Sequence, residues 1–517
     1  MARVAFAVTA VALLVVLWRS TWVRLELAGD NPGTAFPSAR VGEEPLRIAV
    51  TGGGDAGATL SGVEITDVTR DGDVILVRLP AGLPEGGYDL QVTVDRRFPF
   101  GATRARWPIV VDNQPPGLSL AAAPGPGRLD RPTTLTGSIE PGAGLEVDDP
   151  SGTPVTVTTD PAGTFTVTFE RAPGAPVALV ATDPAGNVRT VTATIPVVYP
   201  TPTRAAHLPI GGWADDRIRL PFLQLVETGL IDTVQLDLKD ETGTVGFDSQ
   251  VPLARTIGAV RPSYDLAAVV AELEGRGVRV IGRIVAFRDP VLAEWAWDNG
   301  RQGWVLQDRK GEMLSAFGGY TNYAEQAVRD YNLALAREAV AAGVHDVLWD
   351  YVRRPEGDPG GMVVPGMTGT SRTTGDNIVE FLGQAREQLR PLGAYVGATV
   401  MGIAARRPEN IGQPVDRIAT VVDYVAPTLH PAHVADGECG LATPKRQPYA
   451  VVSCTARDFA AVLRDTPAVL VPWLQDFSLD GVTFGPDEVR EQVRAASDAG
   501  AAGFLLWNPA GVYRYAG

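Results

Sequence analysis

The stretch "DVLWDYVRRP", residues 346–355, carries the pattern that decides the fold of the larger part of this chain. The apolar residues from Val347 to Trp349 lead directly into Asp350, and Arg353 follows three positions later. A carboxylate that is buried beside such a run costs free energy unless a partner compensates for it. The pattern indicates a buried strand of the parallel type that ends in polar residues.

Seven other runs of this type lie between residue 205 and residue 517, and longer amphipathic stretches alternate with them. The runs are "HLPIGGWA", "TVQLDLKD", "RVIGRIVAF", "YVGATVMG", "YVAPTLHP", "AVLVPWLQDF" and "GFLLWNP". Stretches such as "YDLAAVVAELEGRG" carry apolar residues at helical spacing, and several of them end in Gly. Eight strand–helix units in roughly 310 residues predict a TIM (β/α)8 barrel over residues 200–517. A doubly wound sheet is the alternative, although it rarely needs eight such regular repeats.

The residues before the barrel read as two strand-rich modules. Short runs with period-2 alternation, such as "LRIAV" and "YDLQVTV", predict a β-sandwich over residues 28–113. Pro115 and Pro116 mark its end, because they must be extended and cannot donate to a ladder. Residues 114–199 repeat the pattern, and "ATDPAGNVRTVTATI" resembles the end of bacterial Ig-like modules of extracellular proteins. Two Ig-like domains that serve as spacers are expected, with contact to carbohydrate as the alternative role.

The N-terminus reads as an export signal. Arg3 precedes an apolar run from Val4 to Trp18, which matches the charged and apolar regions of a secretory signal. The run is shorter than the roughly 20 residues of a full membrane span. No clear cleavage site follows it, so residues 1–27 are predicted to be an uncleaved signal-anchor, with a cleaved signal peptide as the alternative. Either interpretation predicts an extracytoplasmic protein that is anchored to the membrane or secreted.

Charge and cysteine content narrow the classes of partner and cofactor. The net charge of −15 disfavours nucleic acid as a partner. Cys439 and Cys454 lie fifteen residues apart, and we expect a disulfide between them, worth about 3 kcal/mol. His430 and His433 are a close histidine pair, but no carboxylate stands at ligand spacing beside them. They are expected to line a polar sugar cleft, so neither a metal nor another cofactor is predicted.

Polar and aromatic side chains gather where the predicted strands end, which is the face of a TIM barrel that carries the chemistry. Flat aromatic faces beside carboxylates suit a sugar ring, whose C–H face packs on the aromatic ring while its hydroxyls need polar partners. The residues predicted to bind substrate are Asp237, Lys239, Asp240, Arg283, Arg353, His430, Gln475, Trp213, Trp349, Trp473, Trp507 and Asn508.

Several phrases of the barrel region carry a family resemblance. "LIDTVQLDLKDETGTVGFDS", "GVRVIGRIVAFRDPVLAE", "WDYVRRP", "PWLQDF" and "GFLLWNPAGVY" occur in this order over residues 207–515. In order and spacing they resemble the bacterial "putative glycoside hydrolase" family DUF4015, a TIM-barrel domain. The resemblance implies a likeness to carbohydrate-active barrels and does not extend to residues 1–200.

A glycoside hydrolase needs one carboxylate to stabilise or attack the oxocarbenium-like centre and a second carboxyl group to protonate the leaving oxygen. Asp350 is the first candidate, with Arg353 as the partner that keeps it ionised. The alternative is that the two form a buried ion pair that closes the barrel. Asp476 is the preferred second carboxyl, because Pro472 and Trp473 would give it a rigid, partly apolar setting. A helix cap or turn is its alternative role.

The segment around Asp237, Lys239 and Asp240 is expected to position substrate or to form salt bridges, with a Ca²⁺ site as a weak alternative. Thr399 stands where the resemblance leads us to expect an acidic residue, and His430 stands where a tyrosine is expected. If that acid were the catalytic one, the barrel would be a non-catalytic carbohydrate-binding or envelope scaffold protein. The sequence therefore predicts a polysaccharide hydrolase, with the scaffold as the alternative function.

Overall fold

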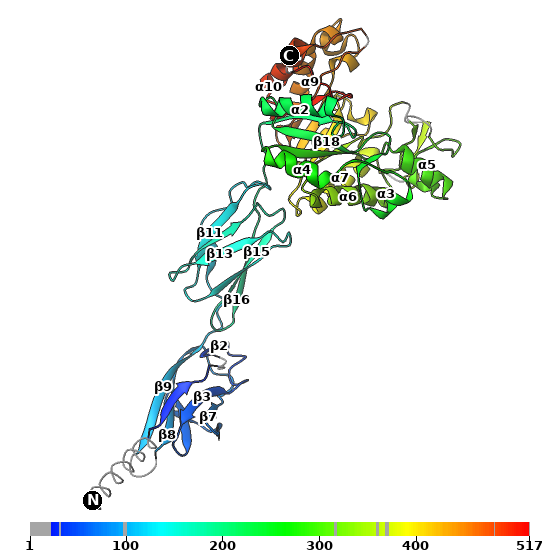
Figure 1. Cartoon of the computed structure of the whole chain (residues 1–517). Helices are drawn as coiled ribbons and strands as arrows, with labels where there is room; N and C mark the ends of the chain where they lie inside the picture. Colours follow the sequence, from blue (N-terminus) through cyan, green and yellow to red (C-terminus); the bar gives the residue numbers. More distant parts are fainter. Residues whose placement is uncertain are drawn as a thin grey trace, which may run out of the picture.

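The computed structural model describes residues 22–29, 33–96, 101–314, 318–357, 361–367, 372–479 and 481–515. In Figure 1 two strand-rich modules and a larger α/β domain follow one another along an extended molecule. The predicted signal-anchor lies almost entirely outside the described residues, although Arg24–Leu27 at its end form strand β1 of the first module. Within the described ranges, no helix is long and apolar enough to cross a membrane.

The first module is a sandwich of two sheets, as the period-2 alternation predicted. Along β3 the side chains of Leu46, Ile48 and Val50 are buried, while those between them face outward. One sheet has the order β1 (Arg24–Leu27), β3 (Leu46–Thr51), β7 (Val74–Val77) and β6 (Val68–Asp71). The other has the order β2 (Ala35–Phe36), β9 (Ala102–Val111), β8 (Gly86–Asp95), β4 (Ala56–Leu60) and β5 (Val63–Ile65).

The second module is also a two-sheet sandwich, with Phe165, Val167 and Phe169 in its core. One sheet has the order β10 (Leu118–Leu120), β11 (Thr133–Ile139), β14 (Thr164–Phe169) and β13 (Val155–Thr159). The other has the order β12 (Gly144–Asp148), β15 (Val177–Thr182) and β16 (Val188–Ala193). Both modules thus build an Ig-like region upstream of the α/β domain.

The α/β domain is a closed barrel of eight parallel strands, which confirms the TIM-barrel prediction. The barrel strands are β17 (Thr203–Leu208), β18 (Thr233–Lys239), β21 (Arg279–Val285), β23 (Asp346–Asp350), β25 (Tyr395–Met401), β26 (Tyr424–Leu429), β28 (Trp473–Gln475) and β29 (Gly503–Trp507). Because β17 pairs in parallel with both β18 and β29, the sheet closes on itself. Short additions are β19 (Val245–Phe247), β20 (Val260–Tyr264), β22 (Gln307–Asp308), β24 (Met362–Val363) and β27 (Val469–Leu470).

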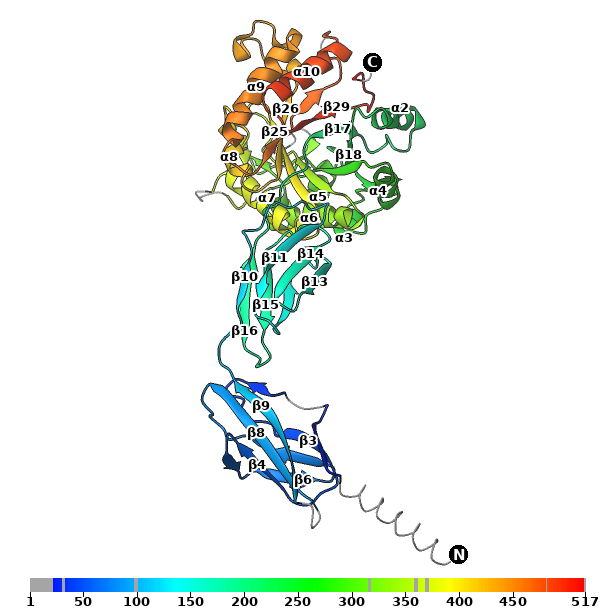
Figure 2. The same ribbon diagram turned by 90° about the vertical axis from the view of Figure 1, so that its left-hand side faces the viewer.

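Helices surround the barrel and bury their apolar faces against its strands (Figure 2). They begin at identifiable caps: Asp265 accepts a hydrogen bond from Ala268 N at the start of α4, and Thr373 with Asp376 forms a capping box at α7. The helices are α2 (Asp216–Glu227), α3 (Pro252–Thr256), α4 (Leu266–Gly275), α5 (Pro290–Asp298), α6 (Gln326–Ala341), α7 (Thr374–Leu389), α8 (Val415–Ile418), α9 (Pro448–Leu463) and α10 (Pro486–Asp498). Short 3-10 turns include η5 (Pro431–His433) and η6 (Glu438–Gly440).

The second module covers the end of the barrel at which the strands begin. Leu129 N donates a hydrogen bond of 2.9 Å to Tyr395 Oη at the start of β25. The ring of Tyr199 packs on Tyr395, and its hydroxyl donates to Asp346 at the start of β23, at 2.8 Å. Since the strands run away from this contact, the opposite end of the barrel, where their carboxyl ends meet, stays free of the module. The candidate site lies at that free end, which we call the mouth.

Candidate functional site

Strand alternation decides which residues of β23 face the interior of the barrel. Asp346 bonds Tyr199 at the closed end, Leu348 packs in the interior cluster, and Asp350 reaches the mouth. Trp349 lies between them in sequence and points the other way, with its ring 4.8 Å from that of Phe381 in α7. The predicted substrate contact of Trp349 therefore does not fit its position, because its ring is fully buried between the barrel and a helix.

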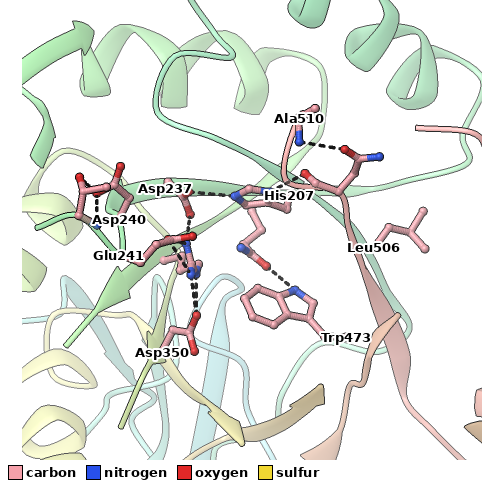
Figure 3. Close-up of polar contacts among 12 residues, drawn as sticks. His207, Asp237, Asp240, Glu241, Asp350, Trp473, Leu506 and Ala510 are labelled. Atoms are coloured by element: carbon pink, nitrogen blue, oxygen red, sulfur yellow. Dashed lines mark hydrogen bonds and ion pairs between the residues drawn. The ribbon is translucent and has the colours of Figure 1, made fainter. Parts of the chain in front are cut away.

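The centre of the mouth is Arg283, whose guanidinium binds three carboxylates. Figure 3 labels these acids, Asp237, Glu241 and Asp350, and marks their contacts with dashed lines. Its Nε and Nη2 lie 2.9 and 2.7 Å from Asp350 Oδ2, and its Nη1 lies 2.9 Å from Asp237 Oδ1. Nη1 and Nη2 each lie 3.2 Å from Glu241 Oε2. Burial opposes the charge of Arg283, but the three carboxylates, Asp237 first, hold its pKa well above the ordinary value. Arg283 therefore stays charged and orients the acids around it.

Asp237 links Arg283 to the first strand of the barrel. Its Oδ2 lies 2.9 Å from Nε2 of His207 in β17, and the other ring nitrogen of His207 lies 3.2 Å from Asn508 O. Burial alone would raise the pKa of Asp237, yet Arg283 and His207 hold it below its usual value. The side chain of Asp237 is only 5% exposed, so its role is to hold Arg283 and His207 in place and not to contact a ligand.

Glu241 is the functional candidate that sequence reasoning missed. It lies beyond Asp240 in the turn after β18, and 35% of its side chain is exposed, against 9% for Asp350. Asp350 Oδ2 and Glu241 Oε2 both bind Arg283 Nη2, at 2.7 and 3.2 Å, so these oxygens are no more than about 6 Å apart. A signal was present in the sequence, since "LKDE" places a second acid directly after Asp240.

Two tryptophans from the last strands form an aromatic wall beside Arg283. The guanidinium carbon lies 4.9 Å from the ring centroid of Trp507 and 5.5 Å from that of Trp473. Trp473 Nε1 donates a hydrogen bond of 2.8 Å to Gln235 Oε1, and Trp507 stacks on His207 with centroids 3.8 Å apart. The structure thus brings together four of the predicted residues, Asp237, Arg283, Trp473 and Trp507, with Asp350.

The predicted pairing of Asp350 with Arg353 is wrong. Tyr351 has a φ of 52°, in the left-handed region, and its backbone N–H donates to Asp350 Oδ1 at 2.7 Å. Arg353 instead lies over the ring of Tyr351, at 4.9 Å, and pairs with Glu356 at 3.3 Å. A non-glycine residue at positive φ costs free energy and is often found at functional sites. With the chain turned at Tyr351, Asp350 pairs with Arg283 of the neighbouring strand β21 and not with Arg353.

Asp476 does not join the group around Arg283. Its carboxylate accepts backbone hydrogen bonds from Arg514 N and Tyr515 N at 3.0 to 3.1 Å, and so holds the C-terminal segment. Burial raises the pKa of Asp476 to about 6 in spite of these bonds. Asn508 donates from Nδ2 to Asp476 O and Val512 O, at 2.5 and 2.6 Å, which fixes the same segment. The position matches the alternative role of Asp476 as a turn residue.

The polar residues at the end of β18 and just after it also take separate structural roles. Lys239 is fully buried outside the barrel interior, where its Nζ lies 2.7 Å from both Asp289 Oδ2 and Asn332 Oδ1. Asp240 accepts hydrogen bonds from Thr242 and Thr244 and shapes the tight turn that presents Glu241. In the described part of the chain, no group of three or more His, Cys, Asp or Glu residues is arranged to hold a metal ion.

The remaining residues predicted from the sequence lie away from Arg283, in the core of the barrel domain or around β25 and β26. Trp213 packs in the core beside α2, with Arg219 over its ring at 5.9 Å. Gln475 accepts from Ala432 N at 3.0 Å and so fixes the turn that carries His430. Thr399 is 5% exposed, and its hydroxyl has no hydrogen-bond partner among the described residues. Cys439 and Cys454 form the predicted disulfide.

Comparisons with known proteins agree with this architecture. Residues 205–513 match the family described as "Putative glycosyl hydrolase domain", and residues 128–198 match the family described as "Bacterial Ig domain". Both matches confirm the resemblances noted in the sequence. No curated protein matches the chain.

Three of the solved structures that the chain matches are the following. A hypothetical protein from Ruminiclostridium thermocellum is 26% identical over 37% of this chain and 96% of its own, with a TM-score of 0.32. The alpha-galactosidase of Thermus thermophilus is 13% identical over 89% of this chain and 97% of its own, with a TM-score of 0.38. The endo-beta-1,4-mannanase of Thermotoga petrophila is 10% identical over 59% of this chain and 67% of its own, with a TM-score of 0.37.

Proposed function

This chain belongs to the putative glycosyl hydrolase domain family, and from that membership we propose that its barrel hydrolyses O-glycosidic bonds of a polysaccharide through Asp350 and Glu241. The observation that carries the proposal is the convergence of both carboxylates on Arg283 Nη2. The pair Asp350 and Glu241 takes the place of the pair Asp350 and Asp476 that was expected from the sequence.

The two carboxylates differ in the way that the reaction requires. Glu241 is the more exposed and stands on a turn, so it is the carboxylate that can leave Arg283, take up a proton from solvent and donate it to the leaving oxygen. Asp350 is held by Arg283 and by Tyr351 N, so it is the fixed carboxylate that attacks or stabilises the sugar carbon. The two oxygens that bind Arg283 Nη2 are at most about 6 Å apart, a bound that accommodates the roughly 5–5.5 Å between the carboxyl groups of retaining enzymes. Trp507, the less buried of the two tryptophans, offers an aromatic face to the sugar ring, and Trp473 packs behind it.

We place the reaction outside the cytoplasm, on a polysaccharide of the cell envelope or its surroundings. The apolar run from Val4 to Trp18 supports export and attachment to the membrane. The disulfide between Cys439 and Cys454 fits an oxidising compartment. The two Ig-like modules are then spacers between the anchor and the barrel.

A second candidate function is a carbohydrate-binding barrel without hydrolytic activity. Arg283 bridges Asp350 and Glu241, so a glycosidic oxygen must displace one of these contacts before either carboxylate can act on it. Thr399 in the place of an expected acid favours the same alternative.

The test uses the full chain with a panel of soluble bacterial and plant polysaccharides, and new reducing ends are measured. Asp350→Asn and Glu241→Gln are each expected to lower the rate by about a thousandfold, while Asp476→Asn keeps it within a few-fold. The matched controls are Asp487→Asn and Glu272→Gln, two surface acids. Full activity in either site variant would refute the pair. Binding of a polysaccharide without release of reducing ends would establish the second candidate.

A further inference from the structure

A cavity of about 800 Å³ opens over the ends of β25 and β26, next to the strand that carries Trp473. Its volume lies within the roughly 300–1,000 Å³ of ligand pockets. Thr428 of β26 lines the cavity and stands opposite Trp473 of β28 in the strand register. The ring of Trp473 in turn lies 5.5 Å from the guanidinium of Arg283. The cavity therefore continues the mouth, and a substrate bound at Arg283 is close enough to extend into it.

The cavity differs from the mouth in the kind of apolar surface that it offers. Its apolar lining consists of one methionine and several aliphatic side chains: Met401, Ile403, Ile411, Leu429, Val434 and Ala435. His430 and His433 also line it, but no Trp, Tyr or Phe is among its described lining residues. Sugar rings pack on flat aromatic faces, whereas chains of CH2 groups are buried well among aliphatic side chains. The lining thus favours an aliphatic group over a sugar ring.

The charged groups of the lining balance one another. Those in the described residues are three arginines and three glutamates: Arg354, Arg406, Arg407, Glu356, Glu409 and Glu438. Arg406 and Arg407 both pair with Glu438, at 3.6 and 2.8 Å. Arg406 also lies 2.6 Å from Asp458 of α9. These two arginines are therefore compensated by acids of the protein itself.

Arg354, Glu356 and Glu409 keep the same balance. Arg354 is buried, and its guanidinium donates to backbone carbonyl oxygens of its own loop and of Asn410. Glu356 pairs with Arg353 at 3.3 Å, and Glu409 is exposed to solvent. An anionic ligand would meet Glu409 and a cationic one would meet Arg354, so neither ion gains from the lining as a whole. The cavity is therefore suited to a group without charge.

A disulfide fixes the wall of the cavity. Cys439 lines it from η6, and its bond to Cys454 ties η6 to α9. Arg406 Nη2 donates to Cys454 Sγ at 2.9 Å, which adds a third segment to the same wall. A cavity that keeps its shape without a ligand loses less free energy to ordering when a ligand binds.

We propose that this cavity binds an uncharged acyl chain that the polysaccharide carries beside the sugar held at Asp350 and Glu241. The assignment rests on the proposed function and deepens it, because it names a class of substrate. The substrate is then an acylated polysaccharide, with its sugar ring at the mouth and its acyl chain in the cavity.

The test measures binding by calorimetry to the full chain carrying Glu241→Gln, so that the probes are not hydrolysed. The probes are the octyl glycosides of glucose, galactose and mannose, with octanol and octanoate for comparison, all below the concentrations at which they form micelles. The tightest octyl glycoside is expected to bind at least about tenfold more tightly than octanol, which lacks the sugar, or octanoate, which is charged. The methyl, butyl and hexyl glycosides of the same sugar then give a length series. Each added CH2 group is expected to strengthen binding about two- to fourfold.

Two variants assign this binding to the cavity. Ala435 is exposed, so Ala435→Trp fills the space without disturbing the core, and Ala435→Ser is its control. Ala435→Trp is expected to abolish the gain with chain length at an unchanged melting temperature. Met401→Gln places an amide in the apolar lining and should weaken binding of the octyl glycoside about tenfold. Met313→Gln, at a half-buried methionine of another cluster, is its control.

A length series without a gain would overturn the proposal, as would unchanged binding in Ala435→Trp. Octanol or octanoate that binds as tightly as every octyl glycoside would also overturn it. A rising series that Ala435→Trp abolishes, in a chain that releases no reducing ends from any polysaccharide, would sustain the acyl site while the hydrolase proposal fails. A series without a gain in a chain that does release them would refute the acyl site alone.

Discussion

Arg283 Nη2 lies 2.7 Å from Asp350 Oδ2, although the two residues come from different strands and Asp350 stands opposite Val285 in the register. The side chain of Arg283 therefore extends by two residues toward the mouth to bind Asp350. It also forms ion pairs with Asp237 and Glu241, so one buried cation links three acids of the mouth.

Replacing Arg283 tests this arrangement as a matter of stability. Arg283→Met leaves two buried acids, Asp237 and Asp350, without their cation, which typically costs about 3–5 kcal/mol. We expect a loss of this size in the free energy of unfolding of the barrel, measured by urea denaturation and tryptophan fluorescence. Arg276→Met removes an exposed arginine that pairs with Glu227 and Glu272, and should cost less than about 1 kcal/mol. Equal losses would contradict a central role for Arg283.

The separation of the proposed carboxylates predicts the stereochemistry of the reaction. With their nearest oxygens at most about 6 Å apart, Asp350 and Glu241 are expected to retain the anomeric configuration. Proton NMR during the first minutes of hydrolysis shows which anomer appears first, before mutarotation mixes the two. Appearance of the inverted anomer first would mean that a water molecule enters between the carboxylates and that the pair opens in the complex.

Asp476 predicts a dependence of stability on pH. Burial raises its pKa to about 6 in the folded chain, against roughly 3.9 in an unfolded one. The folded state thus binds this proton more tightly, and its contribution is complete below about pH 4 and falls as the pH rises to about 6. In Asp476→Asn, which stays neutral and keeps an acceptor for Arg514 N, this fall of about 2 kcal/mol should vanish.

The measurement is the barrel's free energy of unfolding at several pH values from 4 to 8. Asp487→Asn is the matched control, because Asp487 is 87% exposed. An unchanged slope in Asp476→Asn between pH 4 and 6 would show that another group titrates there.

The disulfide between Cys439 and Cys454 closes a loop of fifteen residues. Cross-linking a loop of this length restricts the unfolded chain and is worth about 3 kcal/mol. The double variant Cys439→Ser with Cys454→Ser should lose this amount, and a reducing agent should bring the wild-type chain to the same stability. The agent should leave the double variant unaffected. A wild-type chain that keeps its stability after reduction would contradict the estimate.

Gly174 allows the second module to approach the barrel closely. A Cβ atom at this position would overlap the carbonyl of Arg390, next to Pro391 in the barrel. Gly174→Val is therefore expected to loosen the contact and to raise the hydrogen-exchange rate of the Leu129 amide, which donates to Tyr395 Oη. Gly125→Val is the control, because no atom lies near its Cβ position. Equal exchange rates at Leu129 would show that the contact does not depend on Gly174.

The fold could be predicted because its signals are local and repeated. Each barrel strand is a run of apolar residues, as in the stretch from Val347 to Trp349, and every one before the last is followed by a helical pattern. The site was less predictable, because side-chain direction depends on the parity of each strand position. Asp350 and Trp349 are neighbours in sequence, yet one faces the mouth and the other faces α7. Glu241 was missed because only the turn formed by Asp240 carries it toward Arg283.

The contact between the second module and the start of the barrel strands gives the molecule a direction (Figures 1 and 2). Because Leu129 and Tyr199 cover the closed end, the mouth opens at the end of the barrel that faces away from the second module. If a surface held the N-terminal end, the closed end of the barrel would be turned toward that surface, and the two modules would lie between the surface and the barrel. The barrel would then act on polysaccharide chains that project from that surface, and not on chains that lie flat against it.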